Sequence, residues 1–411
     1  MASNRTIGPV NPRESLDEKP TTAGRSTDHT KRLLQQQSKP VPKNGALGAI
    51  ASAPGRWRLF RPHTAASFVL GLAILYLVYR RGFGLRWDEL WANVASANTP
   101  LLVFAFTVFY CSFPIRALRW RVLLGNVGYA RAAGTPMPST TSLAKIMYLA
   151  SFVNCVTIAR LGDAYRGYLL KKAVGVSFAV TLGTVLAERL LDLIVLAAIL
   201  SATVLVAFRG IMPPGVTDAL VAGLILSGLG ICGVLAMRWF RGVVERVLPG
   251  RLHAHYDRLE HGTVGAFKRV PLLIIYSVLG WIIEGSALYL TAAAMGAPVP
   301  IASALVVALV ASLLTIVPLA PSGLGFTEAG IVLLLKWLGL DTGTAGAVAL
   351  IFRIINYWSI VALGSILYVF VHNASSSRPR FRQAATDHER PAGLNDPIER
   401  REAPFGPRKV P

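Results

Sequence analysis

The chain has 411 residues, of which 53% are hydrophobic and only 15% are charged, and its formal net charge is +21. Because soluble domains carry about 25% charged residues, this composition argues against an ordinary soluble protein and favours a membrane protein. The cations gather in 1–63, in 238–269 and beyond Val371, beside apolar segments, as cytoplasmic flanks of membrane spans do. For that reason nucleic acid is not an expected partner.

The two ends of the chain are polar and differ sharply from the middle. Residues 1–63 lack apolar periodicity, so we expect a disordered basic cytoplasmic tail, and 372–411 predict a second disordered cytoplasmic tail. The part between them, 64–371, is expected to be one all-α domain, a polytopic bundle of transmembrane helices. Its clear spans are predicted at 64–79, 99–118, 177–207, 218–238, 271–295 and 343–371.

Two further apolar stretches, 142–158 and 301–338, are interrupted by polar, Gly and Pro residues. Proline lacks an amide donor and clashes with the preceding turn, and glycine permits positive φ, so a helix is expected to break where they cluster. The predicted break residues are Pro318, Pro321, Gly323 and Gly325. A helix restarting near Phe326 would direct its amide groups at this break and offer an anion site; a simple packing bend is the alternative.

The distribution of cations predicts the topology. The stretch 142–172 has cations on both flanks and is expected to be a hairpin open to the cytoplasm, whereas 301–338 has few and would open to the outside. The result is an inverted repeat of two units, each with three spans and a re-entrant hairpin, with both termini cytoplasmic. Full crossing by the broken stretches is the alternative.

Three groups of cationic residues lie outside the predicted spans, and two of them have more than one interpretation. The segment 238–269 is either an interfacial amphipathic helix or a solvated loop. The Arg119-Trp120 pair is expected to lie in a cytoplasmic loop after 118 and to act as an interfacial anchor. Arg160 and Arg166 are either site residues or plain cytoplasmic flank charges.

Ionisable residues fall at membrane depth in both units. Glu188, Arg189 and Asp192 lie near the middle of one predicted span, and Arg353 and Asn356 hold the equivalent place in the second unit. A charge in lipid is costly unless it is paired or meets water, so these residues are candidates for a lipid-headgroup or proton site. We interpret Arg189 and Arg353 as phosphate ligands; an interhelical salt bridge is the alternative for each.

These residues belong to a longer ordered set. Arg353 has no acidic neighbour in its own span, so its partner is expected to be Glu284 or Glu328. The motifs are Arg119-Trp120; Asn154, Arg160, Gly162, Asp163 and Arg166; Glu188, Arg189 and Asp192; Trp281 and Glu284; and Pro321, Gly323, Gly325 and Glu328. In this order they resemble the polytopic lysylphosphatidylglycerol synthase transmembrane-region family, also called flippase-like, over about 64–371. Two positions depart from the family pattern: Ala159 replaces a usual Pro and Asp163 replaces a usual Glu.

The resemblance implies a bacterial inner-membrane protein that moves a lipid between leaflets. The substrate would be a polar phospholipid or a polyprenyl- or hopanoid-type lipid. The alternative is a non-catalytic scaffold or accessory subunit of an enzyme of lipid or cell-envelope glycan synthesis. The sequence contains no catalytic constellation, nucleotide motif or zinc-type Cys/His spacing, so we expect no enzymatic activity, no cofactor and no metal.

Overall fold

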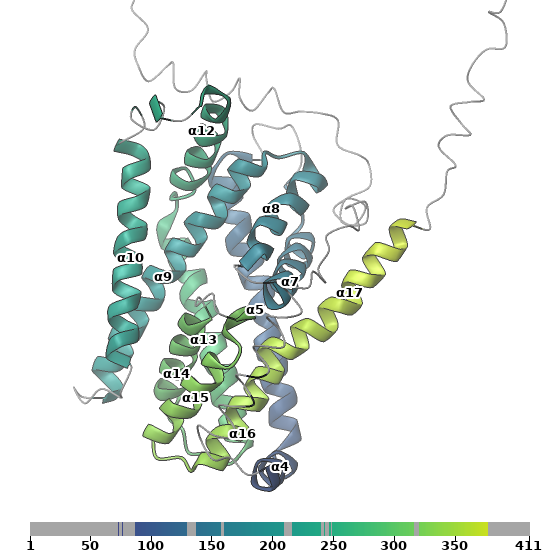
Figure 1. Ribbon diagram of the computed structural model, residues 1–411, viewed down its shortest axis with the longest axis vertical. Helices are drawn as coiled ribbons and strands as arrows, with labels where there is room; N and C mark the ends of the chain where they lie inside the picture. The colour runs from purple at the N-terminus through teal and green to yellow at the C-terminus, as the bar shows by residue number, and fades with distance from the viewer. Residues whose placement is uncertain are drawn as a thin grey trace, which may run out of the picture.

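The structure, a computed structural model, describes residues 87–129, 137–157, 160–208, 216–239, 249–315 and 320–376, together with a few isolated positions. All regular elements in these residues are helices (Figure 1). Of the two predicted tails, the structure describes only 372–376. Ala159, Pro318 and almost all of the predicted span 64–79 also lie outside the described residues.

The predicted all-α polytopic fold is confirmed for the described residues. Four helical stretches are long and apolar enough to cross a bilayer: Thr99–Asn126, Leu220–Trp239, Val270–Ala294 and Thr342–Phe370. They belong to α5 (Thr99–Asn126), α10 (Val216–Trp239), α13 (Val270–Ala294), and the run of α16 (Thr342–Arg353), the π-helix η4 (Ile354–Trp358) and α17 (Ser359–Ser376). Helix α9 (Phe178–Phe208) is also long and apolar but carries three charges near its middle.

Helix α5 extends well beyond the predicted span 99–118. Asn98 caps its first turn, because its side chain accepts a hydrogen bond from the Leu101 amide at 3.2 Å. The helix continues through Arg119 and Trp120, so the cytoplasmic loop predicted after 118 is wrong. The helix can continue within the bundle because the buried polar side chains near its end have partners on neighbouring helices.

Each interrupted stretch forms a helical hairpin. Helix α7 (Thr140–Val156) packs against α8 (Leu161–Val174), and α14 (Ile301–Leu314) packs against α15 (Phe326–Trp337), with the short 3-10 turn η3 (Pro321–Gly323) between the last two. The arms have 12 to 17 residues, fewer than the roughly 20 needed to span a bilayer. Both predicted breaks are therefore observed, while the inverted relation between the two units stays a prediction.

The basic segment 238–269 contains a helix, α12 (Gly250–Val264), which packs along α9. The two backbones approach very closely at two glycines. A Cβ atom on Gly183 would lie 2.4 Å from the Leu259 carbonyl oxygen, and one on Gly262 would lie 2.3 Å from that of Val180. Only glycine fits at such contacts. For 250–264 the structure therefore supports the helix and not the solvated loop.

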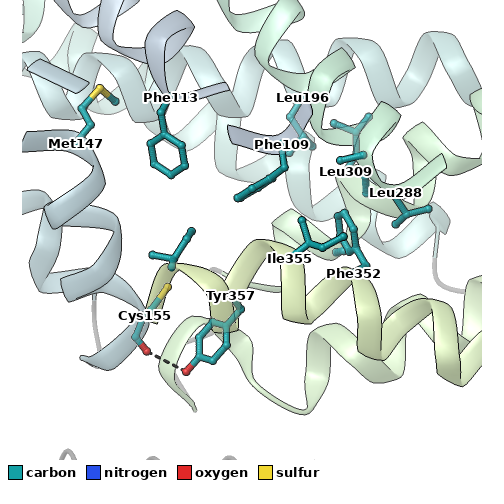
Figure 2. Close-up of a cluster of buried hydrophobic side chains, with 14 of the residues drawn as sticks. Phe109, Phe113, Met147, Cys155, Leu196, Leu288, Leu309, Phe352, Ile355 and Tyr357 are labelled. Atoms are coloured by element: carbon teal, nitrogen blue, oxygen red, sulfur yellow. Dashed lines mark hydrogen bonds between the residues drawn. The ribbon is translucent and has the colours of Figure 1, made fainter. Parts of the chain in front are cut away.

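A continuous apolar core joins the helices around the centre of the bundle. In Figure 2, Phe109 of α5 lies between Phe113 of the same helix and the side chains of Leu309 in α14 and Phe352 in α16, all of which are buried. In the same view the Tyr357 hydroxyl donates a hydrogen bond to the Cys155 carbonyl at 3.1 Å, which joins η4 to the end of α7. The core thus brings the hairpin tips and the last helices to one place.

Candidate functional site

A cavity of about 410 Å³ lies in the centre of the bundle, where the two hairpin tips meet α5, α9, α13 and the α16–η4 junction. Aromatic side chains such as Phe109, Tyr276 and Trp281 line part of its wall. Aliphatic side chains such as Leu193, Leu196 and Ile360 line another part, and polar and charged side chains line the rest. The predicted site residues at its surface are Asn154, Arg160, Asp163, Arg189, Asp192, Glu284, Arg353 and Asn356, and the residues not in that prediction are Arg116 and Arg119.

Arg119 is the centre of a buried ionic cluster between α5, α9 and α13. Its guanidinium donates to Glu188 at 2.8 Å, to Asp192 and to the Ser277 hydroxyl at 2.7 Å. Its neighbour Trp120 is fully buried. The prediction of an interfacial anchor at Arg119-Trp120 is therefore wrong. Sequence alone did not reveal this, because the two acids that hold Arg119 lie on another helix.

Glu188 holds a second arginine as well. Arg166 of α8 pairs with the same carboxylate and stacks on the Trp120 ring, with 3.9 Å between its guanidinium carbon and the ring centroid. Its side chain is almost completely buried. Arg166 is thus part of the ionic core and not a cytoplasmic flank charge. Neither Arg166 nor Glu188 lines the cavity, so the structure places both behind its wall.

Arg189 and Asp163 form a pair that faces the cavity. The guanidinium of Arg189 donates two hydrogen bonds to the Asp163 carboxylate, at 2.8 and 3.0 Å, and approaches Asp192 at 3.8 Å. The side chain of Arg189 is 34% exposed and that of Asp163 is 17% exposed. Asn154 supports the pair from α7, because its amide oxygen accepts a hydrogen bond from the Gly162 amide at 2.8 Å.

Arg353 finds the partner predicted as one of two alternatives, Glu328. The guanidinium donates to that carboxylate at 2.7 Å, and the two side chains are only 4% and 1% exposed. Glu328 also accepts the Gly325 amide at 2.7 Å, so the start of α15 is capped by the protein's own carboxylate. An external anion would have to displace Glu328 to reach the predicted amide site at this helix end.

Glu284, the other predicted candidate, pairs with an arginine that the sequence reasoning missed. Arg116 of α5 donates to it at 2.8 Å, and the Ser312 hydroxyl donates at 2.6 Å. The side chain of Arg116 is 35% exposed. A signal was present in the sequence: Arg116 and Arg119 are three residues apart and share one face of a helix.

The two hairpins are built alike around their acids. Asp163 and Glu328 each occupy the third position of the hairpin's second helix, and each pairs with an arginine of the following helix. The residue that precedes that helix has positive φ in both: 54° at Arg160 and 88° at Gly325. The tips also touch, because the Ser322 hydroxyl donates to the Asn154 carbonyl at 3.2 Å.

The break in the second hairpin depends on close backbone packing. Gly323 has φ of 66°, and a Cβ atom there would lie 2.8 Å from the Leu314 carbonyl oxygen. Ser322 adopts φ of 47° without being glycine. For a residue other than glycine, this conformation costs about 1–3 kcal/mol and is typical of functional sites. Pro321 begins the turn and is buried.

Some polar atoms at the cavity have no hydrogen-bond partner among the described residues. They are the amide oxygen of Asn356, the Thr327 hydroxyl, the indole nitrogen of Trp281 and the Nε of Arg119. Asn356 lies within the π-helix η4, and π-turns are frequent at functional sites. In the described part of the chain, no three His, Cys, Asp or Glu side chains are grouped to hold a metal ion. The arrangement suits hydrogen bonding and charge pairing with a polar ligand.

Comparison with known proteins places this geometry in context. Residues 64–364 match the sequence pattern described as the lysylphosphatidylglycerol synthase TM region. A UPF0104 membrane protein of Methanocaldococcus jannaschii is 32% identical over 56% of this chain and 98% of its own length. Another UPF0104 membrane protein, from Methanothermobacter thermautotrophicus, is 25% identical over 66% of this chain and 84% of its own. Glycosyltransferase AglD of Haloferax volcanii is 24% identical over 64% of this chain and 47% of its own length.

Proposed function

The chain belongs to the lysylphosphatidylglycerol synthase transmembrane-region family, and from this premise we propose that it moves a polar lipid between the leaflets of a membrane. The substrate would be a phospholipid or a polyprenyl- or hopanoid-type lipid. Its headgroup would pass through the central cavity while its tails stay in the bilayer. A bacterial inner membrane, with both termini and α12 cytoplasmic, is part of this proposal.

The observation that carries the proposal is a cavity with charged side chains in its wall, inside a bundle with an apolar exterior. The outer faces of α10 and α13 expose large apolar side chains, among them Leu229, Ile275 and Ile282, as helices in contact with lipid do. The cavity of about 410 Å³ fits within the ~300–1,000 Å³ typical of small-molecule sites. That volume suits a polar lipid headgroup.

The charges of the cavity support a role in headgroup passage. Arg116 and Arg189 line the cavity, and the side chain of each is about one third exposed. Their carboxylate partners, Glu284 and Asp163, are also partly exposed, so these pairs can exchange a protein partner for a lipid group. A guanidinium binds phosphate through two parallel hydrogen bonds, which makes arginine a suitable ligand.

The proposal can be tested by filling the cavity. Gly280 of α13 lines it, and a Cβ atom there meets nothing within 4 Å, so Gly280→Trp should fold and block the passage. Gly233→Trp on α10 is the matched control, because that glycine is exposed and a Cβ there also has open space. In vesicles reconstituted with a fluorescent phospholipid, wild type and Gly233→Trp should transfer the headgroup and Gly280→Trp should not. Equal transfer by all three would refute passage through this cavity.

A scaffold or accessory role in lipid or glycan synthesis is the second candidate, and the similarity to part of a glycosyltransferase favours keeping it. A scaffold has no need for an open cavity. If purified wild type moves no lipid, while Gly280→Trp still supports a synthesis enzyme in cells, the accessory role replaces transport. No reaction is assigned to the chain itself.

A further inference from the structure

The charges around the cavity do not cancel. In the described part of the chain, six arginines either line the cavity or are connected to a lining residue through a chain of ion pairs: Arg116, Arg119, Arg160, Arg166, Arg189 and Arg353. Five acidic side chains accompany them: Asp163, Glu188, Asp192, Glu284 and Glu328. One positive charge is therefore in excess, in a setting where an uncompensated charge is costly.

The cation without a partner is Arg160. Among the described residues it forms no hydrogen bond and no ion pair, whereas each of the other five arginines contacts a carboxylate. The charged side chains that act on Arg160 electrostatically are Arg189, Asp163, Asp192 and Arg116. Two of these four are cations, and both acids among them are already bound by other arginines.

The backbone of Arg160 gives a second, independent reason to assign it a role. The residue has φ of 54° and ψ of 43°, a left-handed conformation that glycine adopts without strain and that side chains disfavour. The matching position of the other hairpin is occupied by Gly325. Arg160 thus combines a strained backbone with an unpaired charge at a cavity. Together these two features indicate that its side chain binds a ligand from outside the chain.

We propose that Arg160 is an anion subsite that receives a singly charged phosphodiester group, with the partly exposed side chain of Arg189 beside it. The proposal rests on the proposed function and narrows its substrate to lipids with a phosphodiester headgroup. A monoanion cancels the one excess charge. A phosphomonoester, with a charge of about −1.5 to −2, overcompensates it, and a neutral headgroup leaves Arg160 unpaired.

The test compares two arginines with the same backbone conformation. Arg160→Gly removes the charge and relieves the left-handed strain, so the variant should melt no lower than wild type. Arg269→Gly is the matched control, because Arg269 also precedes a helix with φ of 53° but is exposed and does not line the cavity. Binding to the full-length purified chain is measured by calorimetry with dioctanoyl phosphatidylglycerol, phosphatidic acid and diacylglycerol, and with free glycerophosphoglycerol.

Wild type and Arg269→Gly should bind dioctanoyl phosphatidylglycerol at least about tenfold more tightly than Arg160→Gly does, as expected for loss of a charged hydrogen bond. They should bind it more tightly than phosphatidic acid or diacylglycerol. Equal binding by a folded Arg160→Gly, or tighter binding of phosphatidic acid, would overturn the subsite. Equal affinity for glycerophosphoglycerol would assign it to a free anion and not to a lipid. Specific binding without transfer in vesicles would refute the proposed function and leave the subsite standing.

Discussion

The acid–arginine pairs of the two hairpins share a construction and differ in their surroundings. Asp163 and Glu328 both lie in the first turn of a hairpin's second helix, and each binds an arginine of the next helix. The pair Asp163–Arg189 is open to the cavity, with 34% of the arginine side chain exposed. The pair Glu328–Arg353 is enclosed, with 4% of the arginine exposed. Matching position does not imply matching role.

The difference follows from what else each acid does. Glu328 also accepts the Gly325 amide, and the Arg353 guanidinium reaches the Ser322 carbonyl at 3.3 Å and lies over the Tyr357 ring. These added contacts hold the break of the second hairpin in place. Asp163 has one weaker additional contact, a hydrogen bond from the Asn154 amide at 3.4 Å. The second pair is therefore suited to supporting the bundle, and the first to exchanging partners with a ligand.

The largest effect is expected for Arg353→Gln. Removing one partner of an enclosed ion pair leaves an uncompensated charge and costs about 3–5 kcal/mol, so this variant should melt far below wild type in detergent. The double variant Arg353→Gln/Glu328→Gln is the control. It removes both charges, and a glutamine oxygen can still accept the Gly325 amide. The double variant should thus melt above the single one. A single variant as stable as wild type would contradict the supporting role.

Arg189→Gln should have a smaller effect on stability and a large effect on transport. Partly exposed pairs contribute about 0–1 kcal/mol, because solvent screens them, so the melting temperature should change little. Headgroup transfer in vesicles should fall severely, and Arg189→Lys should be intermediate, since lysine keeps the charge but loses the two-pronged geometry. Wild-type transfer by a folded Arg189→Gln would remove the difference in function between the two pairs.

The smallest expected effect concerns the contact between the hairpin tips. In a background without Cys111, Cys155 and Cys232, a Ser322→Cys variant should be as stable as its parent and should react with a small aqueous thiol reagent. Ser322 lines the cavity and is only half-buried, whereas Leu313, one helix away, is buried and should react much less after Leu313→Cys. Equally slow labelling at both positions would show that the cavity excludes water.

Much of the fold could be predicted from the sequence, because apolar runs and helix breakers are local signals. The breaks around 157–160 and 315–325, and the spacing that brings Arg189 to Asp192, needed only helix geometry. The end of α5 could not be predicted in the same way. The cations after 118 follow the pattern of a cytoplasmic flank, and only the tertiary structure places Glu188 and Asp192 opposite Arg119.

Most residues of the site could be predicted from the sequence, but the ion pairs between them could not. Arg353 had two candidate acids, and the structure distinguishes them by assigning Glu328 to Arg353 and Glu284 to Arg116. Arg116 itself was missed, since its acid is supplied by α13 from a distant part of the sequence. Ion pairs between helices depend on how the helices rotate about their axes, and apolar composition alone determines that rotation poorly.

The contact of the hairpin tips has a consequence for biosynthesis. The Asn154 carbonyl accepts a hydrogen bond from Ser322, which is synthesised 168 residues later. The Cys155 carbonyl accepts one from Tyr357, which is synthesised 202 residues later. Chains grow at about 5–20 residues per second, so the first hairpin spends roughly ten seconds or more without these partners. During that interval we expect the first hairpin, whose polar groups still lack these partners, to need protection by a membrane insertase or chaperone. Ribosome pausing between α8 and η3 would lengthen the vulnerable stage, and co-expression of the two halves as separate polypeptides would bypass the delay.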